Sequence, residues 1–516
     1  MKTTIPTTQC DYLVIGAGAT ALAFCDSLLL NLQGQQVGQA EGSSVTTPMP
    51  SIVMIDPHDR PGGQWIDSYP FVQLHQPSAM YGVESHALEP TPESAPTHRA
   101  TRDEILMYYE QVIQKWHPYI TFVGGATFDF TSLPSLDPTA RCYYYSRDGV
   151  PCEIRVRKKV VDARYLQPDL PVDTPPRFRF DSKKIHCVPV NDLVTMAGCD
   201  RATPRNNYVV IGGGKTGMDA VYYLLNEKKV TPDHIVWIMP HDAWITARES
   251  IGNCMEFLHM ALMKARKAVQ AEKDLVKYVQ TSSQCLQDAF LQWEKEGKVY
   301  RLDPNLLPTK FKDATLSQQE LTTLRTVSNV IRGRGRVTKI ADTGDLHFED
   351  GSSIALPWQE RCTNTTFVHC SAGAFNYTKQ PQERPPIFTD TFLTIQDVYG
   401  TPGFCFVGSI MGKLESMSNL SNAQKNSLCL APSPAGAPTS SLGPSGGDIG
   451  VLSPTHGFVK RLHNLREWLK VPELRDWLVG HRLFNLGHYS SYQIIQKMVE
   501  EAWTIALLSE LVKESV

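Results

Sequence analysis

The chain has 516 residues, of which 42% are hydrophobic and 20% are charged, and this suits two or three globular domains. Its formal net charge of -3 gives no electrostatic reason to expect nucleic acid or an acidic membrane as a partner. The 12 cysteines contain no Cys-x-x-Cys pair, which argues against a redox dithiol or a zinc ribbon and favours a reducing, cytoplasmic location. We expect no signal peptide, and no apolar run reaches the roughly 20 residues that span a bilayer.

The first motif is a strand pattern at 12–15 that runs into a glycine turn and then an apolar helix pattern at 22–30. Gly16 permits the tight turn and Gly18 lets a pyrophosphate approach the backbone, while Ala21 still allows close packing of helix on strand. The free N–H groups at the start of the helix favour an anion. The motif therefore predicts a dinucleotide site.

An acidic residue is expected at the end of the next strand, where it meets the ribose hydroxyls. Asp56 ends the apolar segment 51–55, but it follows Gly16 by 40 residues. The segment 34–50 is rich in Gln, Gly, Ser and Thr and is predicted to be a flexible loop. Without its 17 residues the spacing is 23, close to the roughly 20 of the motif, so Asp56 is the ribose candidate.

A second strand–turn–helix motif follows, with a strand at 208–211 and a helix at 218–225. It carries all three glycines of the pattern, Gly212, Gly214 and Gly217. One such turn is a weak signal, because glycine turns also join strands to helices for structural reasons alone. Two of them in one chain indicate two nucleotides, one a flavin and the other its reductant.

The residues after the strand at 234–239 bear on the choice of nicotinamide nucleotide. An acidic residue there favours NADH, and a basic residue favours NADPH. His241 and Arg248 are candidates for a 2′-phosphate, although Asp242 lies between them. We expect NADPH, with NADH as the alternative, in which case Arg248 is a solvated surface arginine.

The remaining segments complete an α/β pattern. A Pro-, Gly- and Ser-rich segment at 421–450 is predicted to be a second flexible loop. The other expected elements are a helix at 102–116, helices within 255–295, a hairpin at 349–351 and helices from 458 onward.

Several further segments resemble the flavin-containing monooxygenase superfamily. The segment Gly62-Gly63-Gln64-Trp65 is similar to the Gly-Gly-x-Trp segment beside the flavin, and Leu74-His75-Gln76-Pro77 is similar to the stretch that follows. Residues 368–373 resemble the crossing back to the flavin domain, and the segment 404–408 resembles the final flavin-contacting strand, ending at Gly408. The order of these segments makes the resemblance specific. Trp65 has an alternative role in packing, and His75 and Gln76 have one as capping or turn residues.

The family's identifying segment, Phe-x-Gly-x-x-x-His-x-x-x-aromatic, has a counterpart here in the stretch from Phe180 to His186. Ser182 replaces the glycine and Val190 replaces the aromatic residue. His186 is therefore a candidate, together with His75 and Gln76, for a role in catalysis. The alternative is an ordinary interdomain strand with a surface histidine.

The resemblance implies two Rossmann-like dinucleotide-binding domains, the second inserted in the first. We expect the FAD domain at 1–190 and 361–516, with a mostly helical C-terminal part, and the NAD(P) domain at 191–360. It further implies that NADPH reduces FAD and that O2 then supplies an oxygen atom to a small substrate such as a sulfur or amine compound. No metal is expected. The alternatives are a flavin oxidase or reductase without oxygen transfer, and a non-catalytic binding protein with the same fold.

Overall fold

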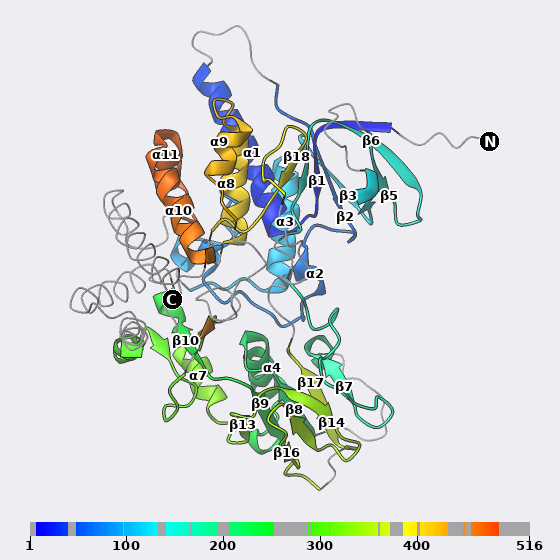
Figure 1. Cartoon of the computed structure of the whole chain (residues 1–516), viewed down its shortest axis with the longest axis vertical. Coiled ribbons are helices and arrows are strands. Elements are labelled where there is room, and N and C mark those ends of the chain that lie inside the picture. The colour runs from blue at the N-terminus through cyan, green and yellow to red at the C-terminus, as the bar shows by residue number, and fades with distance from the viewer. Residues whose placement is uncertain are drawn as a thin grey trace, which may run out of the picture.

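The computed structural model describes residues 7–39, 48–95, 97–132, 141–165, 168–194, 206–251, 287–288, 290–308, 310–359, 362–371, 385–399, 403–431, 447–448 and 456–484. Figure 1 shows two lobes, each built around its own sheet, with the first sheet in the upper lobe and the second in the lower lobe. The predicted α/β fold with two Rossmann-like units is confirmed.

The first sheet has seven strands, and the parallel ones carry the glycine turn. Its parallel strands, in spatial order, are β3 (Ile120–Gly124), β2 (Ile52–Asp56), β1 (Thr7–Ile15), β6 (Pro151–Asp162) and β18 (Phe392–Thr394). β5 (Arg141–Tyr145) and β4 (Thr127–Phe128) extend it on the β6 side as antiparallel strands. Every residue of β2 is buried, as expected for a strand covered on both faces of a parallel sheet.

Helices α1 (Ala19–Gln39) and α8 (Phe404–Ser416) lie side by side on this sheet (Figure 1). A Cβ atom on Gly408 would lie 2.2 Å from the carbonyl oxygen of Thr20, and one on Gly412 would lie 2.4 Å from that of Phe24. The contact advances by one turn on both helices in the same direction. The two helices are therefore parallel and begin at the same end of the sheet.

Gly408 thus lies inside a helix, and the prediction of a final strand at 404–408 is wrong. The last strand of the sheet is β18, and α8 begins directly after Gly403. The apolar residues of this segment suit a strand or a buried helix equally well, and close packing on α1 decides for the helix.

The second sheet has five parallel strands. In spatial order they are β13 (Val330–Arg332), β9 (Ile235–Met239), β8 (Asn207–Ile211), β17 (Thr365–His369) and β7 (Cys187–Pro189). A small antiparallel sheet beside it consists of β14 (Val337–Ile340), β15 (Leu346–Phe348) and β16 (Ser353–Ile354), which confirms the hairpin predicted at 349–351.

The strand pairings bear on the expected range of the second domain, 191–360. β7 precedes this range and β17 follows it, and both pair within the second sheet. β18 and α8 then return to the first sheet and to α1. The limits of the two domains stay a prediction, but the strands that belong to the second sheet extend beyond 191–360 on both sides.

A third sheet and several helices complete the described part of the chain. The sheet consists of β11 (Val299–Tyr300), β10 (Ala243–Ala247), β12 (Lys310–Leu316) and β19 (Gly447–Asp448). The other helices are α2 (Gln64–Asp67), α3 (Arg102–Lys115), α4 (Lys215–Asn226), α7 (Gln318–Leu324), α9 (Asn422–Ser427), α10 (His456–Lys470) and α11 (Pro472–Gly480). None of the described helices is both long and apolar enough to cross a membrane.

The two segments expected to be flexible loops are partly regular. Residues 34–39 form the last part of α1, and residues 40–47 lie outside the described residues. In the second segment, Ser421 caps α9, and β19 pairs with β12, while residues 432–446 lie outside the described residues. Most of the helices expected within 255–295 also fall outside, since residues 252–286 are not described.

Candidate functional site

The first glycine turn lies at the carboxyl end of β1. Gly16 has a φ of +101°, which favours glycine, and its N–H donates to the carbonyl oxygen of Ile55 at 2.9 Å. A Cβ atom on Gly63 would lie 2.8 Å from the Cα atom of Gly18, so the segment before α2 packs directly on the turn. Ala21, in the first turn of α1, is fully buried as the motif predicts. Helix α1 therefore begins directly after this turn, with its N-terminus at the carboxyl end of β1.

Asp56 lies at the end of β2, as predicted, but it already has partners within the chain. Its Oδ2 accepts the N–H of Ala17 at 2.7 Å, and its Oδ1 lies 2.6 Å from Nδ1 of His58. Nε2 of His58 lies 2.9 Å from Asp67. Burial opposes a charge on His58, but the hydrogen bonds and charges of the two carboxylates outweigh it and raise the pKa of this imidazole. Oδ1 also accepts the N–H of His58 at 3.0 Å, whereas Oδ2 can accept a second hydrogen bond, so Asp56 can still meet a ribose hydroxyl.

Two buried polar atoms at this end of the sheet have no partner among the described residues. They are Oε1 of Gln396, which is 1% exposed and follows β18, and Oγ of Ser409, which is 0% exposed and lies in the first half of α8. Buried polar groups normally have hydrogen-bond partners. The two unpaired oxygens, together with the paired N-termini of α1 and α8, fit a polyhydroxylated, anionic ligand such as FAD.

The Gly63-Gln64-Trp65 segment forms the start of α2. Nε1 of Trp65 donates to the hydroxyl of Tyr81 at 2.8 Å, and that hydroxyl lies 2.7 Å from the hydroxyl of Tyr109. The backbone carbonyl of Gln64 accepts hydrogen bonds from Ser68. Trp65 is therefore anchored in the core, which agrees with its alternative role in packing.

The second glycine turn is built more tightly. Gly212 has a φ of +142° and donates to Ile238 at 3.0 Å, and a Cβ atom on Gly217 would lie only 2.0 Å from the carbonyl oxygen of Gly212. Gly214 differs, because a Cβ atom there would meet no atom within 4 Å. Gly212 and Gly217 are thus required by packing alone. The space at Gly214, directly before α4, fits the approach of a pyrophosphate.

The end of β9 carries an ion pair. Oδ1 of Asp242 lies 3.1 Å from Nε of Arg332, at the end of the neighbouring strand β13. His241 is half-buried beside it. Arg248 lies elsewhere: its Nε donates to the carbonyl oxygen of His75 at 3.0 Å. Arg248 therefore contacts His75 of the other lobe, and its role in binding a 2′-phosphate stays a prediction.

Charged side chains from both lobes meet between the sheets, and we call Arg99, Lys215, Asp219, Arg248 and Glu320 the interdomain charge cluster. Glu320 pairs with Nη1 of Arg99 at 3.1 Å and with Nη2 of Arg248. Lys215 pairs with Asp219. The Arg99–Glu320 pair joins α7 of the lower lobe to the segment before α3 of the upper lobe, whereas the Lys215–Asp219 pair lies within α4.

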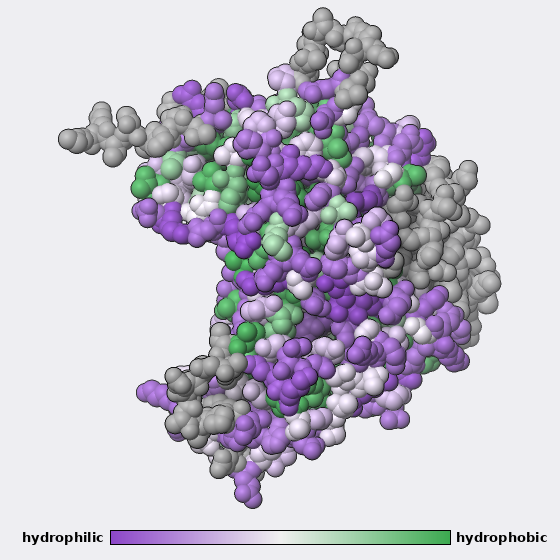
Figure 2. Space-filling view, turned by 180° about the vertical axis from the view of Figure 1, so that it is seen from behind, coloured by the Kyte–Doolittle hydropathy of each residue, from purple (hydrophilic) through white to green (hydrophobic). Residues whose placement is uncertain are grey.

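Two further hydrogen bonds link the lobes. The hydroxyl of Tyr69 donates to Oδ2 of Asp219 at 2.7 Å. Nδ2 of Asn191 donates to the carbonyl oxygen of Asp67 at 2.8 Å. Figure 2 shows that the surface is hollowed between the two lobes on the face turned away from Figure 1.

His75 lies half-buried among the charges of the interdomain cluster. Burial, and next the charge of Lys215, lower the pKa of its imidazole to about 3, with Arg99 and Arg248 adding to the effect. The imidazole is therefore neutral at physiological pH and can donate or accept a hydrogen bond without carrying charge. Gln76 follows it in the same half-buried loop.

His186 lies just before β7, and its carbonyl oxygen accepts the N–H of Phe367. In a parallel sheet this is the amino end, whereas the glycine turn lies at the carboxyl end. At about 3.3 Å per residue, the strand separates the two by ~10 Å. Ser182 is exposed and Val190 is buried. The structure does not bring His186 together with His75 and Gln76.

The sequence reading missed most of the interdomain charge cluster. Arg99, Lys215 and Glu320 are charged residues of loops and helix ends. No motif surrounds Arg99, and Glu320 belongs to a capping box with Ser317, which indicates only the start of a helix. The one available signal was Lys215 inside the glycine turn, where a small or apolar residue would suffice. Among the described residues, no group of His, Cys, Asp and Glu is arranged to hold a metal ion.

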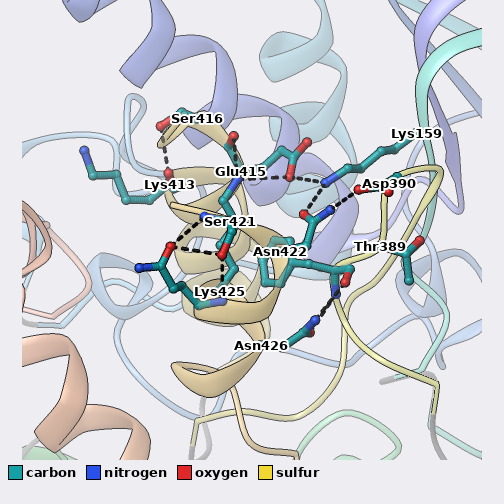
Figure 3. Close-up of polar contacts among 12 residues, drawn as sticks. Lys159, Thr389, Asp390, Lys413, Glu415, Ser416, Ser421, Asn422, Lys425 and Asn426 are labelled. Atoms are coloured by element: carbon teal, nitrogen blue, oxygen red, sulfur yellow. Dashed lines mark hydrogen bonds and ion pairs between the residues drawn. The ribbon is translucent and has the colours of Figure 1, made fainter. Parts of the chain in front are cut away.

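A second buried group of charges, the α8–α9 charge cluster, consists of Lys159, Glu415 and Lys425 (Figure 3). Oε2 of Glu415 lies 2.8 Å from Nζ of Lys159 and 3.7 Å from Nζ of Lys425. Glu415 is near the end of α8, whereas the glycine turn is near its start. All of its elements belong to the upper lobe.

No family model matches the chain. Among curated proteins, the uncharacterized protein Rv2000 of Mycobacterium tuberculosis is 31% identical over 493 residues, which cover 92% of this chain and 78% of that protein. The uncharacterized protein Mb2023 of Mycobacterium bovis matches to the same extent. The chain belongs to the family of these mycobacterial proteins.

Solved structures with a similar fold include two kinds of monooxygenase. A closed crystal structure of cyclohexanone monooxygenase shares 14% identity, with a TM-score of 0.44, over 79% of this chain and 85% of that chain. The flavin-containing monooxygenase from Stenotrophomonas maltophilia shares 14%, with a TM-score of 0.43, over 79% and 97%. These are the kinds of protein that the segments around Trp65 and Gly214 resemble.

Proposed function

We propose that this chain is an FAD-dependent oxidoreductase that is reduced by a nicotinamide nucleotide, NADPH rather than NADH. The observation that carries the proposal is the open space at Gly214, set in a strand–turn–helix unit whose other glycines are required by packing. A second such unit, at Gly16 and Gly18, heads the sheet of the other lobe. Two nucleotide sites on facing lobes suit the transfer of hydride from one nucleotide to another.

A bound flavin supplies the electron-accepting ring that takes hydride from the nicotinamide and passes electrons to O2. The chain's own residues bind the two nucleotides and orient them. The N-termini of α1 and α8 would hold the flavin phosphates, and Asp56 would accept a ribose hydroxyl. The hydrogen bond from Tyr69 to Asp219 links the two lobes. No strong acid or base is needed, so a neutral His75 is consistent with this chemistry.

We further propose a monooxygenase, with a small organic substrate and O2 as co-substrates. The segments around Trp65 and Gly214 support this proposal. The position of His186 at the amino end of the second sheet favours the second candidate, an NAD(P)H oxidase or reductase that transfers no oxygen atom. The ratio of hydrogen peroxide released to NADPH consumed separates the two, since full release without any oxygenated product contradicts the monooxygenase.

The nucleotide assignment is tested by Gly214→Val. Because its side chain would enter open space, this variant should fold and keep its flavin absorbance, yet lose anaerobic reduction by NADPH. The matched control is Gly217→Val, in which the Cβ atom alone meets the Gly212 carbonyl, so it should fail to fold. A colourless wild-type protein, or full reduction of the Gly214→Val flavin, would contradict the proposal.

A further inference from the structure

The interdomain charge cluster carries more positive than negative charge. Its three cations are Arg99, Lys215 and Arg248, and its two carboxylates are Asp219 and Glu320. Both carboxylates accept from cations of the cluster, so one positive charge is left over. Glu249, the acidic residue that directly follows Arg248 in the chain, is exposed.

The side chains that carry this extra positive charge are largely shielded from water. The side chain of Lys215 is 7% exposed, and those of Arg248 and Glu320 are each 10% exposed. A charge removed from water without a partner is costly, so such a cluster favours a complementary anion. The α8–α9 charge cluster also has one more cation than carboxylates, but its ammonium groups have further partners inside the upper lobe: Lys159 donates to Asn422, and Lys425 donates to the carbonyl oxygen of Glu415.

The cluster also has unused donors. Nε of Arg99 donates to Leu74 and its Nη1 to Glu320, and Nε of Arg248 donates to His75 and its Nη2 to Glu320. Nη2 of Arg99 and Nη1 of Arg248 make no hydrogen bond to any described residue. Guanidinium donors are well suited to bind carboxylate or phosphate oxygens.

The electrostatic potential at His75 also favours a bound anion. Of the charged residues that act most strongly on this imidazole, Lys215, Arg99 and Arg248 are cations and Asp219 alone is an anion. A neutral imidazole in a positive potential can donate a hydrogen bond to an anion without adding charge. Lys215, whose charge acts on His75, is the first residue of α4 and directly follows Gly214.

We propose that the interdomain charge cluster binds the acid group, a carboxylate or a phosphate, of the small-molecule substrate. Arg99 and Arg248 would supply the hydrogen bonds from two lobes, Lys215 the charge, and His75 a neutral donor. This inference rests on the proposed function, because it places the substrate beside the nicotinamide site. It narrows the substrate class from a small organic molecule to an organic acid or phosphate ester.

The test is calorimetric titration of the full purified chain with inorganic phosphate and, separately, with acetate. Arg248→Gln and Arg99→Gln should each weaken binding about tenfold or more, the size expected for one charge-assisted hydrogen bond. Arg248→Lys, which keeps the charge, should lose less than Arg248→Gln and covers the case in which the glutamine variant does not fold. Lys425→Gln in the α8–α9 charge cluster is the matched control and should bind as the wild type does.

Equal binding by the wild type and the Arg99→Gln and Arg248→Gln variants, or equal loss in Lys425→Gln, would overturn the inference. Repeating the titration on protein saturated with NADP+ distinguishes the source of the anion. Persistent phosphate binding supports a substrate acid group, whereas its disappearance assigns the cluster to the nucleotide's own phosphates and overturns the substrate assignment. Flavin content and anaerobic reduction are read separately, so failure of the proposed function is seen independently of anion binding.

Discussion

The two buried charge clusters of this molecule are built from similar parts but differ in what they join. The α8–α9 charge cluster connects a strand and two helices of one lobe, and its central Glu415 also accepts a hydrogen bond from Tyr12 at 3.1 Å. The interdomain charge cluster connects two lobes, and one Nη donor of each arginine has no partner among the described residues. The ammonium donors of the α8–α9 charge cluster find their partners inside one lobe, and they serve stability. Charges that are incompletely paired between lobes are available to a ligand.

A substitution of Glu415 is expected to have the largest effect and therefore tests the difference between the two clusters most strongly. Glu415→Gln would leave Lys159 and Lys425 buried without their carboxylate, and we expect the free energy of unfolding to fall by about 3–5 kcal/mol. Urea denaturation measures this loss. Glu110→Gln, at an exposed ion pair with Arg60, is the control and should change stability by less than about 1 kcal/mol. A comparable loss in both variants would remove the distinction between the buried and the exposed pair.

The corresponding change in the other cluster is Glu320→Gln. Here the side chains are less enclosed and the lobes can relax, so we expect a loss of about 1–3 kcal/mol in the free energy of unfolding. The effect on function should be larger than the effect on stability, because Arg99 and Arg248 lose the carboxylate that orients them. Stopped-flow reduction by NADPH should slow about tenfold or more. If Glu415→Gln slows reduction equally at full flavin occupancy, the functional contrast between the clusters is wrong.

Acid pH should reduce the contribution of Glu320 to the free energy of unfolding. Burial raises the pKa of Glu320, but Lys215, the N–H of Ser317 and the two arginines outweigh it and lower the pKa from 4.5 to about 2. The folded state thus favours the carboxylate. Its contribution to stability is complete above pH 4.5 and is lost as the pH falls toward 2. The difference in unfolding free energy between wild type and Glu320→Gln should shrink over this window, and a difference that grows on acidification would contradict the assignment.

Tyr69→Phe is the mildest change, since it removes one hydrogen bond to Asp219 and no charge. We expect the free energy of unfolding to fall by about 0.5–1.5 kcal/mol. The lobes should also become less firmly held, which increases hydrogen–deuterium exchange in the segments around Tyr69 and α4. Tyr81→Phe, whose hydroxyl bonds within the upper lobe, is the control and should leave exchange in α4 unchanged.

Local patterns allowed much of the fold to be predicted. The two glycine turns, the position of Asp56 at the end of β2 and the helix α3 depend on residues close together in the chain. The start of α3 is an example, because Thr101 and Glu104 form a reciprocal capping box within four residues. Such signals survive in the sequence because neighbouring residues alone satisfy the backbone groups.

Local patterns do not predict the surroundings of residues whose neighbours come from distant parts of the chain. The segment at Gly408 is apolar throughout, so its pattern could not distinguish a strand from a helix packed against α1. Arg248 follows β10 by sequence but is held by His75 and Glu320, which lie 173 and 72 residues away. No local pattern records a partner at that separation.

The sequence by itself determined that this protein has two glycine turns, each between an apolar strand and a helix, and hence two Rossmann-like units. Hydrophobic periodicity and glycine chemistry act over a few residues, so they can be read directly. Only the tertiary structure decided that Gly214 faces open space while Gly217 is required by packing. It also decided that Arg99, Lys215 and Arg248 meet beside His75. Electrostatic potential and free volume depend on every group within several ångströms, and the fold alone brings those groups together.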